Sequence, residues 1–430
     1  MKTNLLIFLL LACLLSCNRS KKVITHFEDY KSYLNPAKLA SSSLPSEELK
    51  FWEERLEKNN NDETSLVKLG GIHAELFKST GVVQHILISD SLYTQVLKNY
   101  RAGSVEIYQS LAANAITQHR FQSAKDYAEK ALALKDKKAA SLLILVDVSL
   151  EIGDYARANL VLKDFRNKNS FAYLIRRAKL NDHEGHLDSA IVCMEKAYQR
   201  IKGNKALSQW TRSNLADMYG HAGRVKDSYD LYLQVLKDNP GDDYALKGLA
   251  WIALSHDLNT QAAKTIINEL AVRKRMPEAH LMMAEIAGLD GNQTERAYHL
   301  KKFKSLVSVP QYKRMYNKYL ATLESEEFQN PDAAIGIAME EIANRPTPQS
   351  YDLLAWAYYH QKNLPKALSI ATGRVEDQTF EPDAFYHLGI IYQANGNHEK
   401  ASYYLNKALE SEFELGPSIS KKIKVALQNL

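Results

Sequence analysis

The densest group of metal-ligating residue types in the sequence spans residues 182–188, which read DHEGHLD. Two histidines three positions apart, His183 and His186, stand among carboxylates, and imidazole and carboxylate are common ligands of divalent ions. The stretch also lies across a predicted turn between two helices, where polar side chains are expected on any protein surface. Because turn chemistry explains the pattern equally well, we predict neither a metal ligand nor a catalytic residue from it.

Other catalytic patterns are missing from the sequence. It contains no G-x-S-x-G, no G-x-x-x-x-G-K, no G-x-G-x-x-G after a strand, and no H-E-x-x-H. Cys193 stands between Val192 and Met194 on a predicted helix, where a lone thiol packs as a small hydrophobic group. We therefore predict a protein that is not an enzyme and needs no cofactor, with an enzyme built on the two histidines as an alternative.

The composition and charge exclude several classes of protein. Of 430 residues, 45% are hydrophobic and 24% are charged, and the net charge is +5. These values are typical of a globular chain and exclude collagen-like or largely disordered ones. The basic runs at 273–275, 301–304 and 421–424 are far apart, and the net charge is small for a dedicated nucleic-acid binder. We expect solvated surface there and no nucleic-acid partner.

The amino-terminal residues 1–22 read MKTNLLIFLLLACLLSCNRSKK, with Lys2 before an apolar run of 11 residues from Leu5 to Leu15. A helix of that length spans about 16 Å, roughly half of the hydrocarbon core of a bilayer. The run is therefore too short to cross a membrane and is typical of a signal peptide.

The letters LLSC at 14–17 resemble the lipobox of bacterial lipoproteins, in which a small residue precedes the cysteine that receives lipid. The resemblance implies cleavage after Ser16, acyl chains such as palmitate on Cys17, and a membrane-anchored envelope protein. LLAC at 10–13 also fits, so Cys13 is an alternative, but the full apolar run precedes Cys17 and polar residues follow it. An ordinary secretory signal cleaved elsewhere is a further alternative. Residues 18–22 lack the acidic run that sends some lipoproteins to the outer surface, so we expect an outer-membrane protein facing the periplasm.

Beyond this leader the sequence predicts helices nearly throughout, and the pattern repeats. Between Val105 and Pro382 the repeat makes eight steps, of which five are 34 residues long and the others 32, 38 and 37. The aligned segments begin at Glu63, Val105, Ala139, Phe171, Gln209, Asp243, Pro277, Arg314, Pro348 and Pro382.

Small residues recur at two places in this unit, which lets facing helices approach closely. Position 8 holds Gly70, Ala112, Val146, Ala178, Ala216, Ala250, Ala284, Ala321, Ala355 and Gly389. Position 20 holds Ala124, Ala158, Ala190, Ser228, Ala262, Arg296, Ala333, Ala367 and Ala401. Glycine at position 15 supplies the positive φ that ends a helix, at Gly153, Gly185, Gly223, Gly291 and Gly396.

A helix-turn-helix unit of 34 residues with these small positions resembles the tetratricopeptide repeat. The last copy matches best, with consensus residue types at Phe385, Leu388, Gly389, Tyr392, Gly396, Ala401, Leu405 and Ala408. The resemblance covers Glu63–Glu414. It implies an all-α fold, namely a right-handed superhelical solenoid of about ten helix-turn-helix units. An irregular solenoid of unrelated helical hairpins is the alternative.

The chain divides into four predicted segments: a lipoprotein signal peptide at 1–16, the lipidated Cys17 with a tether over 17–45, a repeat array at 46–414 and a capping helix at 415–430. Residues 46–59 predict a lone helix before the first full unit. Whether Val23–Leu34 is a short helix or part of the tether is left open by the sequence. About eight extra residues around Lys78–Ser89 predict a longer turn in the first unit.

In this family the first helix of each unit lines the concave face of the superhelix, and positions 2, 5, 6, 9, 12 and 13 usually contact a ligand. In units five to ten these positions carry aromatic and polar side chains, a mixture that anchors a peptide or a sugar. Lys318, Tyr319 and Asp352 are among them. We predict partner binding by Trp210, Asn214, Tyr244, Lys247, Trp251, Trp356, Tyr359, His360, Tyr386 and His387. The alternative is that these rings complete the packing between adjacent helices.

Taken together, the leader and the repeats predict a lipid-anchored scaffold or adaptor of the cell envelope. It would bind a protein or peptide partner in the concave groove without catalysis. The alternative is an outer-membrane lipoprotein that binds a nutrient or glycan on a helical-repeat scaffold. Proteins of that second kind interrupt their repeats with long loops, whereas most steps here stay at or near 34 residues.

Overall fold

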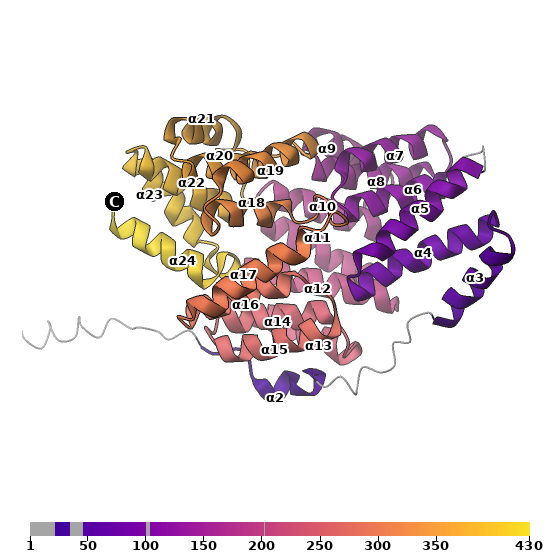
Figure 1. Cartoon of the computed structure of the whole chain (residues 1–430), viewed down its shortest axis with the longest axis horizontal. Coiled ribbons are helices and arrows are strands. Elements are labelled where there is room, and N and C mark those ends of the chain that lie inside the picture. The colour runs from indigo at the N-terminus through magenta and orange to yellow at the C-terminus, as the bar shows by residue number, and fades with distance from the viewer. Residues whose placement is uncertain (1–21, 35–45, 100–103, 202) are drawn as a thin grey trace, which may run out of the picture.

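The structure is a computed structural model that describes residues 22–34, 46–99, 104–201 and 203–430, and no described residue forms a strand. Helix follows helix with short connections, as Figure 1 shows. The first five pairs are α4 (Glu63–Thr80) with α5 (Val83–Asn99), α6 (Val105–Thr117) with α7 (Phe121–Ala133), α8 (Lys138–Glu151) with α9 (Tyr155–Lys163), α10 (Phe171–His183) with α11 (Leu187–Arg200), and α12 (Lys205–His221) with α13 (Val225–Asp238). The next five are α14 (Asp243–Ser255) with α15 (Thr260–Arg273), α16 (Glu278–Leu289) with α17 (Gln293–Val307), α18 (Asn317–Glu326) with α19 (Pro331–Asn344), α20 (Pro348–His360) with α21 (Leu364–Arg374), and α22 (Pro382–Ala394) with α23 (His398–Leu409).

Most of these hairpins have a turn of the same backbone geometry. The five glycines predicted at position 15 all have positive φ, and Gly153 and Gly223 have values of 79° and 72°. His119 and Lys362 occupy the same position with φ of 53° and 67° although they are not glycines. The residue after the turn donates its N–H to a carbonyl five positions back, as Asp154 does to Ser149 at 2.8 Å. The predicted turn position is therefore correct.

Units six and eight have a turn that is one residue longer. Their positive φ falls at Leu258 (53°) and Gln329 (51°), and the closing hydrogen bond runs six residues back, from Asn259 N to Ala253 O at 2.8 Å. The second helix is therefore displaced by one residue. The buried small residue of the second helix is Ala263 in unit six and Ala334 in unit eight. The prediction that Ala262 and Ala333 make the close contact is therefore wrong by one position.

Close helix contacts explain the other small residues. Ala250 and Ala401 are fully buried, and a Cβ on Gly389 would lie 2.6 Å from Leu405 Cγ. The first unit differs from the prediction, because its extra residues lengthen α4 and α5 to 18 and 17 residues instead of extending the turn. Gly81, with φ of 71°, ends α4 two residues before α5 begins.

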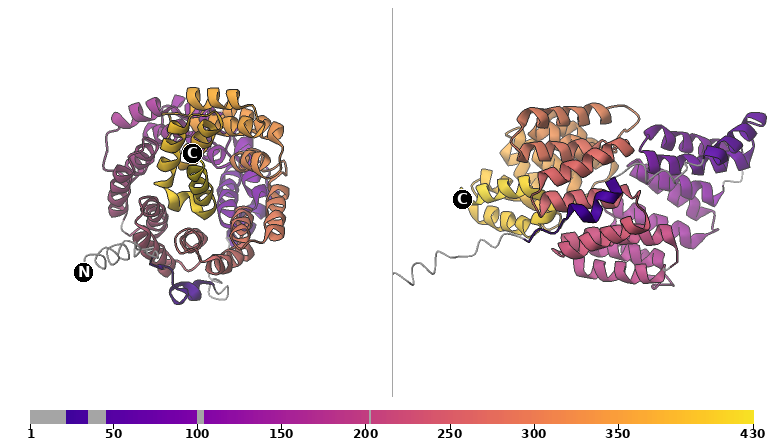
Figure 2. Two further views of the ribbon diagram at one scale, coloured as in Figure 1. Left: turned by 90° about the vertical axis from the view of Figure 1, so that its left-hand side faces the viewer. Right: turned by 90° about the horizontal axis from the view of Figure 1, so that it is seen from below.

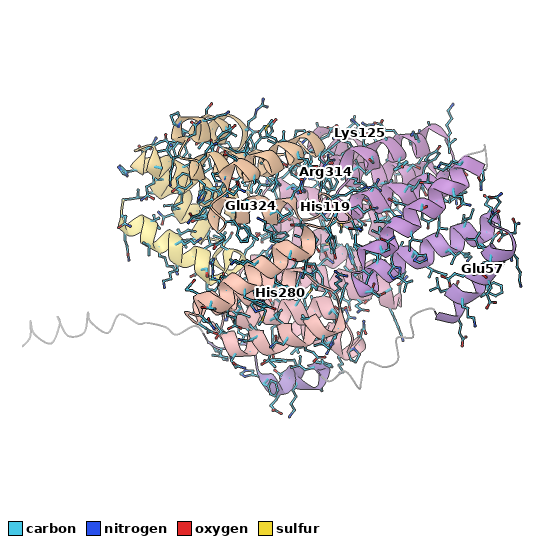
Figure 3. The ribbon with its side chains drawn as sticks, viewed as in Figure 1. Glu57, His119, Lys125, His280, Arg314 and Glu324 are labelled. Carbon is cyan, nitrogen blue, oxygen red and sulfur yellow. The ribbon has the colours of Figure 1, made fainter. Side chains whose placement is uncertain are left out.

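The ten hairpins wind into a superhelical solenoid, as predicted, and its outline in the end-on view of Figure 2 is a ring because later units stack on earlier ones. Units eight and nine return to units two and three, and the contact between them is called the seam below. Asn344 at the end of α19 donates to His119 O at 2.8 Å and accepts from Phe121 N at 3.1 Å. Figure 3 labels His119 at this place. The seam joins units that are far apart in the sequence and so makes the array compact.

Residues outside the hairpins cover the same units from two sides. On the outside of the ring, α2 (Phe27–Tyr30) and the 3-10 helix η1 (Lys31–Leu34) pack against α13 and α15, so residues 22–34 form a docked segment (Figure 2). On the inside, α24 (Glu412–Gln428) follows the last unit, and Gly416 breaks its first turn with φ of 78° and ψ of 172°. The predicted lone helix before the array is α3 (Ser46–Lys58), which packs on α4.

No described helix is long and apolar enough to cross a membrane. The leader, including Cys13, Ser16 and Cys17, lies outside the described residues. Lipidation of Cys17 and the envelope location therefore stay predictions.

Candidate functional site

The concave face of units five to seven, where a partner was expected, is covered by the chain's own α24. This helix packs against α12, α14 and α16, which are the first helices of those units. The indole of Trp251 donates through Nε1 to Phe413 O at 3.1 Å, and Ser255 Oγ donates to the same carbonyl at 2.6 Å. The prediction that Trp251 faces an open groove is therefore wrong, because α24 takes the place of a partner there.

Four other predicted residues of units five and six do reach solvent. Trp210 and Tyr244 are each 45% exposed. Asn214 donates to the Trp210 carbonyl at 2.8 Å, and the Lys247 ammonium lies 5.2 Å from the centre of the Tyr244 ring. Tyr244 also donates to Asp217, and burial together with that carboxylate raises its pKa. Trp210 and Tyr244 are thus accessible to a partner, although the Trp210 ring also packs edge-on against Phe171.

The predicted residues of units nine and ten form a packed aromatic cluster. Trp356 stacks on Tyr359 at 4.8 Å and on His387 at 4.0 Å between ring centres. Trp356, Tyr386 and His387 are buried, with exposed fractions of 3%, 5% and 6%. The expectation of exposed anchors is wrong for these three, because adjacent first helices lie close enough for their rings to stack. Tyr359 and His360 are partly exposed at the edge of the cluster.

Beside this cluster lies a cavity of about 220 Å³, called the concave-face cavity below. Its walls come from α18, α20 and α22, with Leu281 of α16 and Ile419 of α24 closing one side. The apolar part is Leu281, Leu323, Leu353, Ala384 and Ile419, and the charged part is Lys318, Glu326, Arg345, Asp352, Glu381, Asp383 and His387. Such a mixture of apolar walls with a few converging polar groups is typical of ligand-binding pockets.

Two charge pairs organise the polar half of this cavity. Lys318 Nζ lies 3.1 Å from Asp383 Oδ2, and His387 Nδ1 lies 2.7 Å from Asp352 Oδ2. Burial opposes ionisation of Asp383, but the Lys318 charge outweighs it and lowers the pKa of that carboxyl. Burial likewise opposes protonation of His387, yet the Asp352 carboxylate raises its pKa. The charged form of the Lys318–Asp383 pair is therefore favoured, and the half-exposed Lys318 can exchange its partner for a ligand carboxylate.

Glu326 links the cavity to the aromatic cluster and to the carboxyl-terminal helix. Its carboxylate accepts from Trp356 Nε1 at 3.0 Å and pairs with Lys422 of α24 at 3.0 Å. Burial opposes its ionisation, and Lys422 is the largest of the neighbours that lower its pKa. The cavity and the cluster thus form one connected site.

The repeat register predicts part of the lining of this cavity. Lys318 and Asp352 stand at position 5 of their units, and both line the cavity. Asp383 and Glu326 were not singled out, although they occupy positions 2 and 13 and the same positional rule selects them. Arg345 follows α19 and reaches the cavity from between two units, so no position in the repeat predicts it.

The residues first considered for catalysis lie elsewhere. His183 stacks on Tyr155 with ring centres 5.2 Å apart, and burial lowers its pKa. Cys193 is partly buried and accepts from Asn181 Nδ2 at 3.7 Å, and burial raises the pKa of its thiol. Within the described ranges no group of three His, Cys, Asp or Glu side chains is arranged to hold a metal ion.

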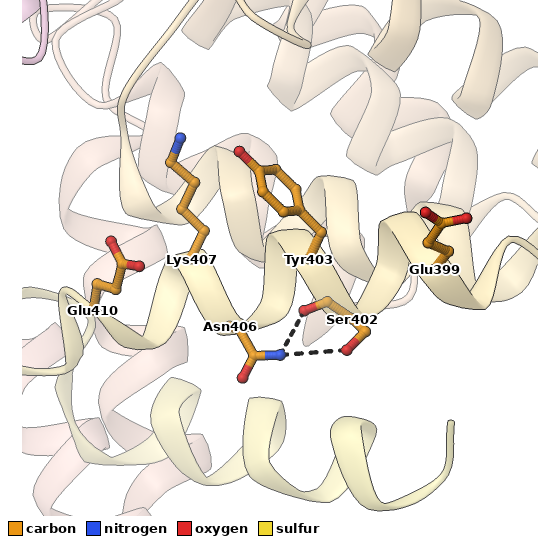
Figure 4. A pocket seen from close by; sticks show the side chains of 6 residues that line it. All are labelled: Glu399, Ser402, Tyr403, Asn406, Lys407 and Glu410. Atoms are coloured by element: carbon orange, nitrogen blue, oxygen red, sulfur yellow. Dashed lines mark hydrogen bonds between the residues drawn. The ribbon is translucent and has the colours of Figure 1, made fainter.

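A wider hollow of about 690 Å³ lies on the outer face of α23 (Figure 4). Five of the six residues that line it belong to α23 and the sixth, Glu410, is its C-cap, and Asn406 donates to Ser402 O at 2.8 Å across a single turn. Because no second helix or loop closes it, this surface is a poor binding site.

Residues 382–414, which form the last hairpin, match the family model of the tetratricopeptide repeat. The chain carries the tetratricopeptide repeat. The match covers one unit. The other nine units are helix pairs of the same order, and six of them, units two to five, seven and nine, share its turn. No curated protein matches the sequence at a significant level.

Several solved structures resemble the chain at low identity. A tetratricopeptide repeat protein from Parabacteroides merdae is 19% identical with a TM-score of 0.36, over 60% of this chain and 97% of that one. Pseudomonas aeruginosa PilF is 14% identical with a TM-score of 0.36, over 49% and 96%. The human IFIT1 dimer with m7Gppp-AAAA is 14% identical with a TM-score of 0.44, over 89% and 93%. These values are too low to carry any functional argument.

Proposed function

We propose that this protein is a non-catalytic scaffold, anchored by lipid in a bacterial cell envelope, that holds a peptide segment of a protein partner in the concave-face cavity. The observation that carries the proposal is the cavity itself. It lies on the first helices of units eight to ten, combines apolar walls with the Lys318–Asp383 pair, and is small enough to accept one or two side chains.

The rim of the cavity offers groups that a peptide can reach. Tyr319 is 43% exposed, and the Lys318 side chain is 52% exposed while it pairs with Asp383. An aromatic ring gives a large contact area at low entropic cost, and a lysine exchanges ligand carboxylates readily because its charge is compact. A partner segment with an acidic residue next to an apolar one fits this pair of neighbours.

Pull-down from detergent extracts tests the proposal. A variant with Lys318→Ala and Tyr319→Ala is expected to recover at least tenfold less of the partner than the parent. The matched control is Tyr403→Ala with Lys407→Ala on α23, which removes the same two residue types from the surface in Figure 4. Equal recovery by both variants would contradict binding at this cavity.

The proposed anchor also orients the molecule. Six residues separate Cys17 from Ile24, where the docked segment of residues 22–34 begins its contacts. Such a stretch spans at most about 25 Å when fully extended. A lipid on Cys17 would therefore hold α13 and α15 toward the periplasmic side of the outer membrane. The Cys17→Ser protein is expected to leave the membrane fraction or to keep its signal peptide, and normal processing with full membrane retention would contradict the anchor.

A further inference from the structure

A second cavity, of about 270 Å³, lies where the first unit meets units six to eight, and we call it the closure cavity. Its walls are the end of α4, the start of α14, the connection from α15 to α16, and residues 312–316 before α18. It is separate from the concave-face cavity and shares no lining residue with it. Nothing in the proposed scaffold function assigns it a role.

Hydrogen bonds between the first unit and the α15–α16 connection hold the walls of the closure cavity together. Arg275 N donates to Thr80 O at 3.2 Å, and Lys274 Nζ donates to Lys78 O at 2.5 Å, so the α15–α16 connection caps the end of α4. A Cβ on Gly81 would lie 2.2 Å from Arg275 O, so only glycine permits this approach. These backbone contacts fix the positions of the cationic side chains around the cavity.

Positive charge exceeds negative charge in its lining. Four cations, Lys78, Lys247, Lys274 and Arg275, face two carboxylates, Asp243 and Glu278, and Lys78 also pairs with Glu75 at 3.2 Å outside the lining.

Both carboxylates already have partners. Asp243 lies 3.8 Å from Arg273, and Glu278 lies near the Tyr316 hydroxyl, whose pKa it helps to raise. Within the described part of the chain neither Arg275 nor Lys247 forms an ion pair, and the Lys247 ammonium lies 5.2 Å from the centre of the Tyr244 ring. The cavity therefore has cationic capacity that the chain itself does not use.

Tyr312 gives an independent indication of a ligand. Its side chain is 2% exposed and lines the cavity, yet its hydroxyl has no hydrogen-bond partner within the described part of the chain. Burial raises the pKa of Tyr312, and the nearby positive charge of Arg275 opposes that rise. A buried hydroxyl without an acceptor is costly, by about 1–3 kcal/mol, so its retention is explained if an acceptor arrives with a ligand.

The remaining walls are apolar or aromatic, with Phe77, Met276, Met315 and the rings of Tyr244 and Tyr316. A volume of about 270 Å³ is below the usual range for drug-sized ligands, so the occupant is a small molecule or the end of a longer one. We propose that the closure cavity binds an organic carboxylate carried on an apolar group, with Arg275 and Lys247 facing the charge. The Tyr312 hydroxyl, which is covered in the free protein, donates to the carboxylate once the ring shifts toward the cavity.

Calorimetric titration of the full-length protein with N-acetyl-phenylalanine tests this proposal, with N-acetyl-phenylalaninamide and inorganic phosphate as the two comparison probes. The acid is expected to bind at least tenfold more tightly than the amide, because only the acid carries the charge. It is also expected to bind more tightly than phosphate, because only the acid carries an apolar group. Equal binding of acid and amide, binding of phosphate alone, or no binding of any probe would overturn the proposal.

Two substitutions assign the binding to this cavity. Arg275→Gln is expected to weaken binding of the acid about tenfold, and Arg224→Gln, which removes a half-exposed arginine on another turn, serves as its control. Tyr312→Phe is expected to weaken binding about fivefold without lowering the melting temperature, because it removes only a hydroxyl that has no partner in the free protein. Unchanged binding in both variants would overturn the proposal even where the parent binds the acid.

Discussion

The docked segment of residues 22–34 and the helix α24 cover units five and six from opposite faces, and one hydrophobic cluster joins them. Tyr30 of the first and Phe413 of the second both pack into the cluster formed by α13, α14 and α15. The docked segment lies on the second helices, outside the ring, whereas α24 lies on the first helices, inside it. The middle of the array is therefore held between the two ends of the described chain.

The two ends are held by different chemistry. The docked segment depends on one carboxylate, because Asp257 accepts from Ile24 N at 3.0 Å, from Thr25 N at 2.8 Å and from Thr25 Oγ1 at 2.6 Å. Tyr229 adds a bond from His26 N at 3.1 Å. In contrast, α24 packs by apolar surface around Trp251, and the ion pairs Glu414–His221 and Lys422–Glu326 lie beside that contact. The contribution of Asp257 should thus depend on pH, whereas the contribution of Trp251 should not.

The largest expected effect is that of Trp251→Ala, which removes the indole beneath α24 and its bond to Phe413 O. Loss of a large packed aromatic side chain costs about 3 kcal/mol of unfolding free energy, because the space is only partly refilled. Urea unfolding followed by circular dichroism measures it. Trp210→Ala is the control, since that ring is 45% exposed and its loss should cost below about 1 kcal/mol. Equal costs would show that α24 does not depend on Trp251.

A somewhat smaller effect is expected for Asp257→Ala at the other end. The substitution leaves the N–H groups of Ile24 and Thr25 without their acceptor, which costs about 2 kcal/mol. Hydrogen exchange at residues 24–30 should accelerate while exchange in α24 stays the same. Asp230→Ala removes an exposed carboxylate that pairs only with Lys226, and it should change neither region. Faster exchange throughout the chain would contradict a local role for Asp257.

The contributions of Asp257 and Trp251 to stability should also differ in their pH dependence. Burial opposes ionisation of Asp257, but the bonds from Thr25, His256 and the Ile24 and Thr25 backbone outweigh it and lower its pKa. Its stabilisation is therefore present above the unfolded carboxyl pKa of about 4 and is lost as the pH falls through the folded value. The difference in unfolding free energy between the parent and Asp257→Ala should shrink between pH 5 and pH 3. The Trp251→Ala difference should stay constant there, and a parallel decline would remove the contrast.

The smallest effect is expected for Lys422→Ala, which breaks the pair with Glu326 where α24 meets the concave-face cavity. Lys422 is half-exposed, so solvent screens the pair and the cost should be below 1 kcal/mol at low salt and near zero at high salt. Thermal unfolding at two salt concentrations measures it. A loss of several kcal/mol, unchanged by salt, would mean that charge and not apolar packing holds α24.

The sequence by itself determined the local elements of this protein. Glycine at position 15 predicts a positive φ wherever it stands, and the alanines at position 8 predict close helix contacts, because both effects depend on residue type and near neighbours. Two of these glycines have a second role that no local pattern contains. A Cβ on Gly185 would meet the Phe380 ring at 2.6 Å, and one on Gly153 would lie 3.2 Å from Thr347 Cγ2, across contacts between distant units.

Only the tertiary structure determines which side of each first helix is open to a ligand or partner. The positional rule placed Trp251, Trp356 and Tyr386 on the inner side of the ring, but it could not state how closely the neighbouring helices approach or where the last helix would lie. Both depend on how all ten units are rotated relative to one another, and the turns of units six and eight, which are one residue longer, contribute to that rotation. In the folded chain α24 occupies the expected groove. The open cavities lie beside α24 and where unit one meets units six to eight.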